Sequence, residues 1–323
     1  MKRVYILAAL FICICSFAFA TGNKDAKRAN GKITVTATIF PPYDFTRAIA
    51  GDTVNLKMLL PPGAESHSFE PTPRDITAIQ NSDIFMYIGG ESDVWVDRIL
   101  DSIDTKYTKN MKIIRLMDTV DVVEEEIVEG MEEEEEDPLL ALDIELEPEY
   151  DEHIWTAPQN VVRMVRVITD ALCEKDAANA GSYRQNAAAY TAKLNDLDAA
   201  FQRVAGNANR KTIVFGDRFP FRYFADAYGL SYFAAFPGCS TETEPSAATV
   251  AFLIDKVKAE NIPVIFHIEL SNEKMADAIA EETGAKKRLL HAAHNISKRD
   301  FDVGVTYLDL MTRNVDTLRE ALQ

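Results

Sequence analysis

Two blocks of alternating strand-like and helix-like segments constrain the fold of this chain more than any other feature. The first block contains four short β-rich runs, at 33–39, 54–60, 84–88 and 112–116. Helical stretches separate these runs, at 43–50, 73–81 and 94–103. The second block has strand-like runs at 212–215, 231–236, 262–269 and 287–291. Its helical stretches lie at 221–228, 246–260, 272–283 and 305–322. Alternation of this kind, with apolar strands, predicts parallel sheets covered by helices on both faces.

A long helical stretch separates the two blocks. Its apolar residues recur every three or four positions and form one face of a helix over about six turns: Tyr183, Ala187, Tyr190, Leu194, Leu197, Phe201 and Val204. We therefore predict an α/β protein of two lobes, each with a parallel sheet flanked by helices, joined by a long rigid helix. The N-terminal lobe is expected at 31–157, the helical connector at 158–207 and the C-terminal lobe at 208–323. A ligand cleft is expected between the lobes, at the carboxyl ends of the strands.

The first 20 residues have the pattern of a secretory signal. Basic residues precede an apolar run from Val4 to Phe19, and small residues lead up to Ala20. The run is shorter than the roughly 20 residues that a membrane-spanning helix needs. We predict a signal peptide at 1–20 and a periplasmic or otherwise extracytoplasmic protein. Cysteines within the run leave a lipid anchor as the alternative.

An acidic tract lies near the end of the first block. Between Asp121 and Glu152 there are 17 Asp or Glu residues and no Lys or Arg, which equals the net charge of −17 for the whole chain. Carboxylates at this density repel each other, so the acidic loop at 121–152 is predicted to be mobile from Glu124 to Glu149 and to attract cations without forming the main site; a solvated loop with no role is the alternative. The acidic balance also argues against nucleic acid as a partner, because phosphate binding needs a basic face.

Two histidine motifs flank this tract. His67 follows a predicted strand and a Pro-Pro-Gly turn, and His153 follows two carboxylates. In the second block His291 ends a predicted strand and His294 follows three residues later. Neutral imidazole is a common zinc ligand, and such histidines usually donate their second N–H to a carboxylate or carbonyl oxygen. His267 lies inside an apolar strand and is interpreted as a core residue.

Several motifs together carry a family resemblance. They read Gly63-x-Glu65-x-His67-x-Phe69-Glu70-Pro71-x-Pro73-x-Asp75, Asp151-x-His153-x-Trp155-x-x-Pro158-x-Asn160, Tyr223-Phe224-Ala225-x-x-Tyr228-Gly229-Leu230, Glu244-Pro245-Ser246 and Ile279-Ala280-x-Glu282-Thr283-Gly284-Ala285. From about Ile33 to the C-terminus, the chain resembles the substrate-binding proteins of zinc and manganese ABC importers, in particular the ZnuA-like branch. The resemblance implies two α/β lobes joined by a rigid helix, a metal held between them, and delivery of that metal to a membrane permease.

The resemblance also implies which residues bind the metal. His67 and His153 match the two ligands of the N-terminal lobe. The family usually has a third histidine where this chain has Arg218, whose charged guanidinium is not an ordinary ligand. The fourth family ligand, commonly a carboxylate, falls near His291, so His291 is expected to contribute more than His294 to completing the site. Carboxylate alternatives are Asp217, Glu242 and Glu269.

Zinc is the predicted cargo. Three or four imidazoles suit tetrahedral Zn²⁺, whereas Mn²⁺ prefers carboxylate and water; copper and nickel also accept nitrogen ligands. We expect a monomeric, non-enzymatic protein that captures Zn²⁺ in the interlobe cleft and delivers it to the permease. The alternatives are a manganese-specific binding protein, a secreted zinc-dependent hydrolase and an adhesive surface protein. A hydrolase needs an open coordination position and a general base, and no His-Glu-x-x-His motif is present. Pairing of Cys173 with Cys239 is left open.

Overall fold

The structure is a computed structural model that describes residues 31–66, 69–131, 149–240 and 245–323. Four sequence predictions lie outside the described residues: the signal peptide, His67, Glu242 and the middle of the acidic tract. The chain divides into two units, 1–32 and 33–323, and the fold below is that of the second unit. Among the described helices, none is both long and apolar enough to cross a membrane.

The N-terminal lobe is built on a four-stranded parallel sheet with the order β2-β1-β3-β4. Its strands are β1 (Thr34–Ala37), β2 (Asn55–Met58), β3 (Ile84–Tyr87) and β4 (Lys112–Arg115). Its helices are α1 (Phe40–Ala50), α2 (Pro73–Gln80), α3 (Val94–Ser102) and the short α4 (Thr105–Thr108). The alternation predicted for this lobe is confirmed. The short helix α4 was not predicted, because its four residues show no apolar periodicity.

The C-terminal lobe repeats this architecture with the strand order β6-β5-β7-β8, again entirely parallel. Its strands are β5 (Thr212–Phe219), β6 (Ser231–Pro237), β7 (Val264–His267) and β8 (Lys286–Leu289). Its helices are α7 (Arg222–Tyr228), α8 (Ala247–Glu260), α9 (Lys274–Thr283), α10 (Lys298–Asp302) and α11 (Tyr307–Leu322). Strand β5 runs four residues past its predicted end, with a register shift between Phe215 and Arg218.

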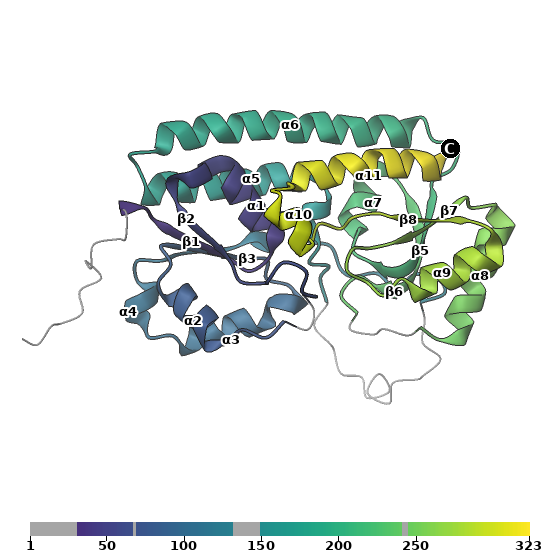
Figure 1. The fold of residues 1–323 in the computed structure, drawn as a ribbon, viewed down its shortest axis with the longest axis horizontal. Coiled ribbons are helices and arrows are strands. Elements are labelled where there is room, and N and C mark those ends of the chain that lie inside the picture. Colours follow the sequence, from purple (N-terminus) through teal and green to yellow (C-terminus); the bar gives the residue numbers. More distant parts are fainter. Residues whose placement is uncertain (1–30, 67–68, 132–148, 241–244) are drawn as a thin grey trace, which may run out of the picture. The chain divides into compact units, whose positions relative to one another are not determined.

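Two helices make the predicted connector, α5 (Pro158–Lys175) and α6 (Ala180–Gly206). Helix α6 packs against α5 and α1 of the first half of the chain and against α7 and α11 of the second (Figure 1). All seven residues of its apolar stripe are buried. The largest buried apolar cluster is therefore continuous from one lobe to the other, which gives both halves of the site one rigid support.

The acidic tract is described only in its two outer arms, 121–131 and 149–152. The arms lie antiparallel: Glu124 and Tyr150 form a β-bridge, and the Glu125 amide donates to the Glu149 carbonyl at 2.8 Å. Met131, at the end of the first arm, is only 6% exposed. The prediction of a mobile tract is wrong for these arms, because apolar and hydroxyl groups elsewhere in the chain hold them.

Candidate metal site

A cavity contains two of the four predicted histidines and is lined from both lobes. The side chains that matter here are Glu65, Ser66, His153, Arg218, Glu269 and His294, and Gly238 contributes backbone. Most of these residues follow the carboxyl end of a strand: Ser66 comes after β2, Gly238 after β6, Glu269 after β7 and His294 after β8. Because parallel strands end at one edge of a sheet, their loops converge on this point.

His153 lies at the start of the short 3₁₀ turn Ile154–Thr156 and is fully buried. One carboxylate oxygen of Asp151 accepts the His153 backbone N–H at 2.7 Å and lies 3.1 Å from ring Nδ1. This geometry fixes Nδ1 as the protonated nitrogen and leaves Nε2 as the atom that can coordinate a metal. The sequence predicted a loop position for His153, which is confirmed, but did not predict its complete burial.

His294 approaches His153 from the C-terminal lobe. The two ring centroids are 5.3 Å apart and the rings are nearly perpendicular, at 86°. Ser66 Oγ lies 3.3 Å from His294 Nδ1, so a residue of the N-terminal lobe helps to orient this ring. Trp155 contacts both imidazoles, with ring centroids 5.3 Å from His153 and 4.9 Å from His294.

Hydrogen bonds across the lobes fix these loops relative to each other. The Trp155 indole N–H donates to the Ala292 carbonyl at 2.7 Å. The Asn295 amide donates to the carbonyls of Pro61 and Ala64, at 2.9 and 2.7 Å. The loop that ends at Ser66, directly before His67, is thus held against the turn that carries His294.

His291 and Glu269 support that same turn. The Glu269 carboxylate accepts the backbone N–H groups of Ala292 and His294, at 2.7 and 2.9 Å. His291 Nδ1 accepts the Ala293 N–H at 2.9 Å and lies 3.3 Å from a Glu269 oxygen. Ala293 itself has a φ of 59°, in the left-handed region. Among the described histidines, His153 and His294 line the cavity and His291 does not.

The other sequence candidates are placed as follows. Arg218 lines the cavity, and its Nε donates to the Ser240 carbonyl at 2.5 Å. Asp217 does not line it; its carboxylate accepts the Ile268 N–H at 3.1 Å. His267 ends β7 with Nδ1 3.1 Å from the Ile268 carbonyl and does not line the cavity, but it is only partly buried and so is not the core residue that the sequence suggested.

Buried carboxylates make the surroundings of His153 strongly negative. Burial raises the pKa of Glu152, although this side chain accepts the Ser92 N–H at 2.8 Å and the Ser92 hydroxyl at 2.5 Å. Burial and the nearby Glu152 raise the pKa of Asp93 to about 7. Burial alone would lower the pKa of His153, but Asp151 and Glu152 outweigh it, so the pKa is raised. An environment that penalises its own negative charges favours an incoming cation.

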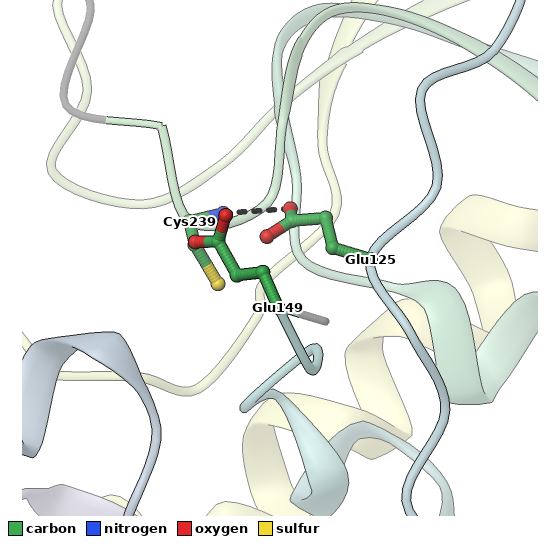
Figure 2. Close-up of side chains that lie close together, drawn as sticks. All are labelled: Glu125, Glu149 and Cys239. Atoms are coloured by element: carbon green, nitrogen blue, oxygen red, sulfur yellow. Dashed lines mark hydrogen bonds between the residues drawn. The ribbon is translucent and has the colours of Figure 1, made fainter. Parts of the chain in front are cut away.

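A second cluster of metal-binding side chain types lies at the base of the acidic arms. Figure 2 shows Glu125 and Glu149 beside Cys239, with the Cys239 amide donating to a Glu125 oxygen at 3.0 Å. Burial and the neighbouring carboxylates raise the pKa of the Cys239 thiol, so it is neutral at pH 7. Cys239 and Cys173 are both free thiols in this structure.

Gly238 lies so close to His153 that a larger residue at this position should move the imidazole. A Cβ at this position would lie 2.9 Å from the Phe219 carbonyl oxygen and 3.2 Å from two atoms of the His153 ring. We expect Gly238→Ala to displace His153 and to weaken metal binding by roughly 10-fold, since tilting a ligand costs about as much as removing the group that orients it. Isothermal titration with Zn²⁺ measures the change. The matched control is Gly181→Ala on α6, where nothing lies within 4 Å of the new Cβ; unchanged affinity in both variants would contradict the prediction.

Comparison with protein families identifies one match. The model of the family described as ZnuA, zinc-uptake complex component A, periplasmic, matches residues 35–321. The match therefore covers both lobes and the connector between them.

Individual proteins give the same result. The chain is 32% identical to the high-affinity zinc uptake system protein ZnuA of Bacillus subtilis, over 99% of this chain and 97% of that protein. It is also 32% identical to the zinc-binding lipoprotein AdcA of Streptococcus pneumoniae, but it spans only 61% of the length of AdcA. The crystal structure of the Zn(II)-bound ZnuA-like domain of Streptococcus pneumoniae AdcA superimposes with a TM-score of 0.71 at 30% identity, covering 90% of this chain and 99% of that domain.

Proposed function

This chain belongs to the ZnuA family of zinc-uptake complex components, and we propose that it captures Zn²⁺ outside the cytoplasm and delivers it to the permease of an ABC importer. It is a binding protein and not an enzyme. One observation carries the proposal: His153 and His294, from opposite lobes, face each other at 5.3 Å inside one cavity. Two buried imidazoles at that separation can bind one metal ion between them. Because they come from opposite lobes, the proposed site lies between the lobes.

The proposed ligands are His67, His153 and His294. Ser66, directly before His67, already lines the cavity and contacts His294, which supports a place for His67 beside it. Glu65 and Glu269 are carboxylates that line the same cavity, and Glu269, named as an alternative from the sequence, remains the candidate fourth ligand. Three imidazoles with one oxygen ligand suit tetrahedral Zn²⁺ better than Mn²⁺. His291, the fourth predicted histidine, is proposed to act through the turn that it supports.

Delivery follows from burial. His153 is 0% exposed, so we propose that a bound ion leaves when the contacts between the lobes loosen. A partner protein that breaks the hydrogen bonds of Trp155 and Asn295 between the lobes would open the cavity. We propose that the permease provides this partner surface. We also propose that the chain acts as a monomer.

The location of the protein follows the same family assignment. We propose that residues 1–20 are a signal peptide and that the protein works in the periplasm or at the outer face of the membrane. AdcA is a lipoprotein by name, so a lipid anchor is the alternative for this chain. Mass spectrometry of the exported protein distinguishes cleavage after Ala20 from a lipidated cysteine.

Equilibrium titration of the metal-free protein tests the main proposal. We expect one Zn²⁺ per chain and an affinity for Zn²⁺ at least roughly 100-fold above that for Mn²⁺, because the proposed ligands are mainly nitrogen atoms. Competition with a chromophoric chelator measures both constants. Tighter binding of Mn²⁺ would favour the manganese-specific alternative. Absence of tight binding of either metal would refute the proposed function.

A further inference from the structure

The two described arms of the acidic tract are fastened to the C-terminal lobe, although both arise from the N-terminal half of the chain. We call residues 121–131 and 149–151 the strap. The first arm leaves the N-terminal sheet after β4, and the second arm leads directly into His153. The acidic composition of the strap predicts no fixed contacts for its residues. The contacts that the structure shows therefore suggest a role for the strap.

The outer contacts of the strap include a hydrogen bond, an ion pair and a packing contact. Glu126 accepts a hydrogen bond from the Tyr232 hydroxyl at 2.9 Å and forms an ion pair with Arg222 at 3.0 Å. Gly130, with a φ of 92°, packs so closely on Phe252 of α8 that an added Cβ would overlap the ring. Arg222 and Glu126 are 25% and 44% exposed, so water screens their attraction and the ion pair alone holds the strap weakly.

The inner contacts are the Cys239 amide, which donates to Glu125 at 3.0 Å, and one buried hydroxyl. Tyr223, on α7 of the C-terminal lobe, accepts the Val123 N–H at 3.2 Å and donates to the Asp151 carbonyl at 2.8 Å. One side chain thus joins both arms of the strap. The carboxylate of the same Asp151 holds the backbone and the ring of His153. A continuous series of hydrogen bonds therefore runs from α7 through Tyr223 and Asp151 to the imidazole.

We propose that the strap positions His153 from the C-terminal lobe, with Tyr223 as the positioning residue, and that metal release requires the strap to detach. This inference rests on the proposed function, because it concerns the same ion and the same histidine. It assigns a role to the described acidic residues that differs from attracting cations. The strap makes a residue of the N-terminal lobe dependent on the C-terminal lobe for its orientation.

Tyr223→Phe tests this directly, because it removes the hydroxyl and keeps the ring. Two hydrogen bonds of ordinary strength are lost, each worth a factor of roughly 3 to 10. We expect Zn²⁺ to dissociate roughly 10-fold faster into excess chelator in a stopped-flow measurement. The visible spectrum of bound Co²⁺ should also change, since this spectrum reports the arrangement of the ligands.

Tyr183→Phe is the matched control. The Tyr183 hydroxyl also has two partners, Asp176 at 2.6 Å and Thr53 at 3.0 Å, and it lies at the start of α6, away from the strap. This variant should lose a similar amount of thermal stability while its Zn²⁺ dissociation rate and Co²⁺ spectrum stay as in the wild type. If general destabilisation caused the effect, Tyr223→Phe and Tyr183→Phe would change the Zn²⁺ dissociation rate to a similar extent.

Glu126→Gln tests the outer contacts. High salt should speed the release of Zn²⁺ from the wild type because it screens the Glu126–Arg222 pair, and the variant should release faster at low salt with less dependence on salt. If the wild type binds Zn²⁺ tightly and both strap variants release it at the wild-type rate, the strap proposal is wrong and the proposed function stands. If the wild type binds no Zn²⁺, the proposed function fails and the strap proposal fails with it.

Discussion

Replacement of His153 by alanine is expected to lower the affinity for Zn²⁺ by more than about 100-fold. Removal of a group that only hydrogen-bonds a metal-binding histidine costs roughly 10- to 100-fold, so loss of the ligand itself should cost more. Competition titration against a chelator of known affinity measures the change. A second measurement is thermal: Zn²⁺ at about 100 times the wild-type dissociation constant should stabilise the wild type by about 2.7 kcal/mol, and the same concentration should stabilise the variant by less than about 0.4 kcal/mol.

The burial of His153 affects how this experiment is read. Its ring is completely enclosed beside Trp155, so His153→Ala leaves a cavity and also removes a partner of Asp151. Some loss of stability without metal is therefore expected, of about 1–3 kcal/mol. His267→Ala serves as the control, since His267 is a histidine of the same protein that does not line the cavity. Equal affinity in His153→Ala and the wild type would remove this residue from the site.

Local sequence patterns were sufficient to predict the framework. Apolar alternation located all eight strands, and the apolar stripe of α6 located the connector, because burial on a sheet or a helix face imposes a period on the sequence. The loops that carry Ser66 and His153 were predictable for the same reason, since they follow or adjoin those elements. The family resemblance then singled out one histidine next to each of these positions, His67 and His153, as a proposed ligand.

The strap shows what composition could not predict. Carboxylates at high density favour a mobile loop when only neighbours in sequence are considered. Their partners, Tyr223, Tyr232 and Arg222, lie about 100 residues later in the chain, and nothing local marks them. The same limit applies to Glu269, whose role depends on backbone N–H groups of a turn 23 residues away.

The choice between His291 and His294 was also beyond the sequence. Both histidines follow the last strand, and the resemblance placed His291 nearer to the usual ligand. Between them lies Ala293 in the left-handed region, with a φ of 59°, which the sequence does not reveal. An alanine gives no sign of that conformation, because L-residues other than glycine rarely adopt it. In this structure His294 lines the cavity and His291 does not, and the proposed ligand set follows that placement.

His294→Ala is therefore expected to weaken Zn²⁺ binding by more than about 100-fold, and His291→Ala by only about 10-fold. The first variant removes a ring that faces His153. The second removes the acceptor of the Ala293 N–H and a neighbour of Glu269, and so loosens the turn without removing a proposed ligand. Parallel titrations of both variants with Zn²⁺ measure the order of the two effects.

The spectrum of bound Co²⁺ gives an independent readout of the same order. With His294→Ala the absorption should lose intensity and shift because the number of nitrogen ligands falls. With His291→Ala the spectrum should keep the wild-type shape at saturating metal, since the same ligands bind the ion once the metal site is filled. His291→Asn should recover part of the affinity, because its side-chain oxygen can accept the Ala293 N–H in place of Nδ1. A larger loss in His291→Ala than in His294→Ala would show instead that His291 is the ligand and that the turn rearranges around the bound ion.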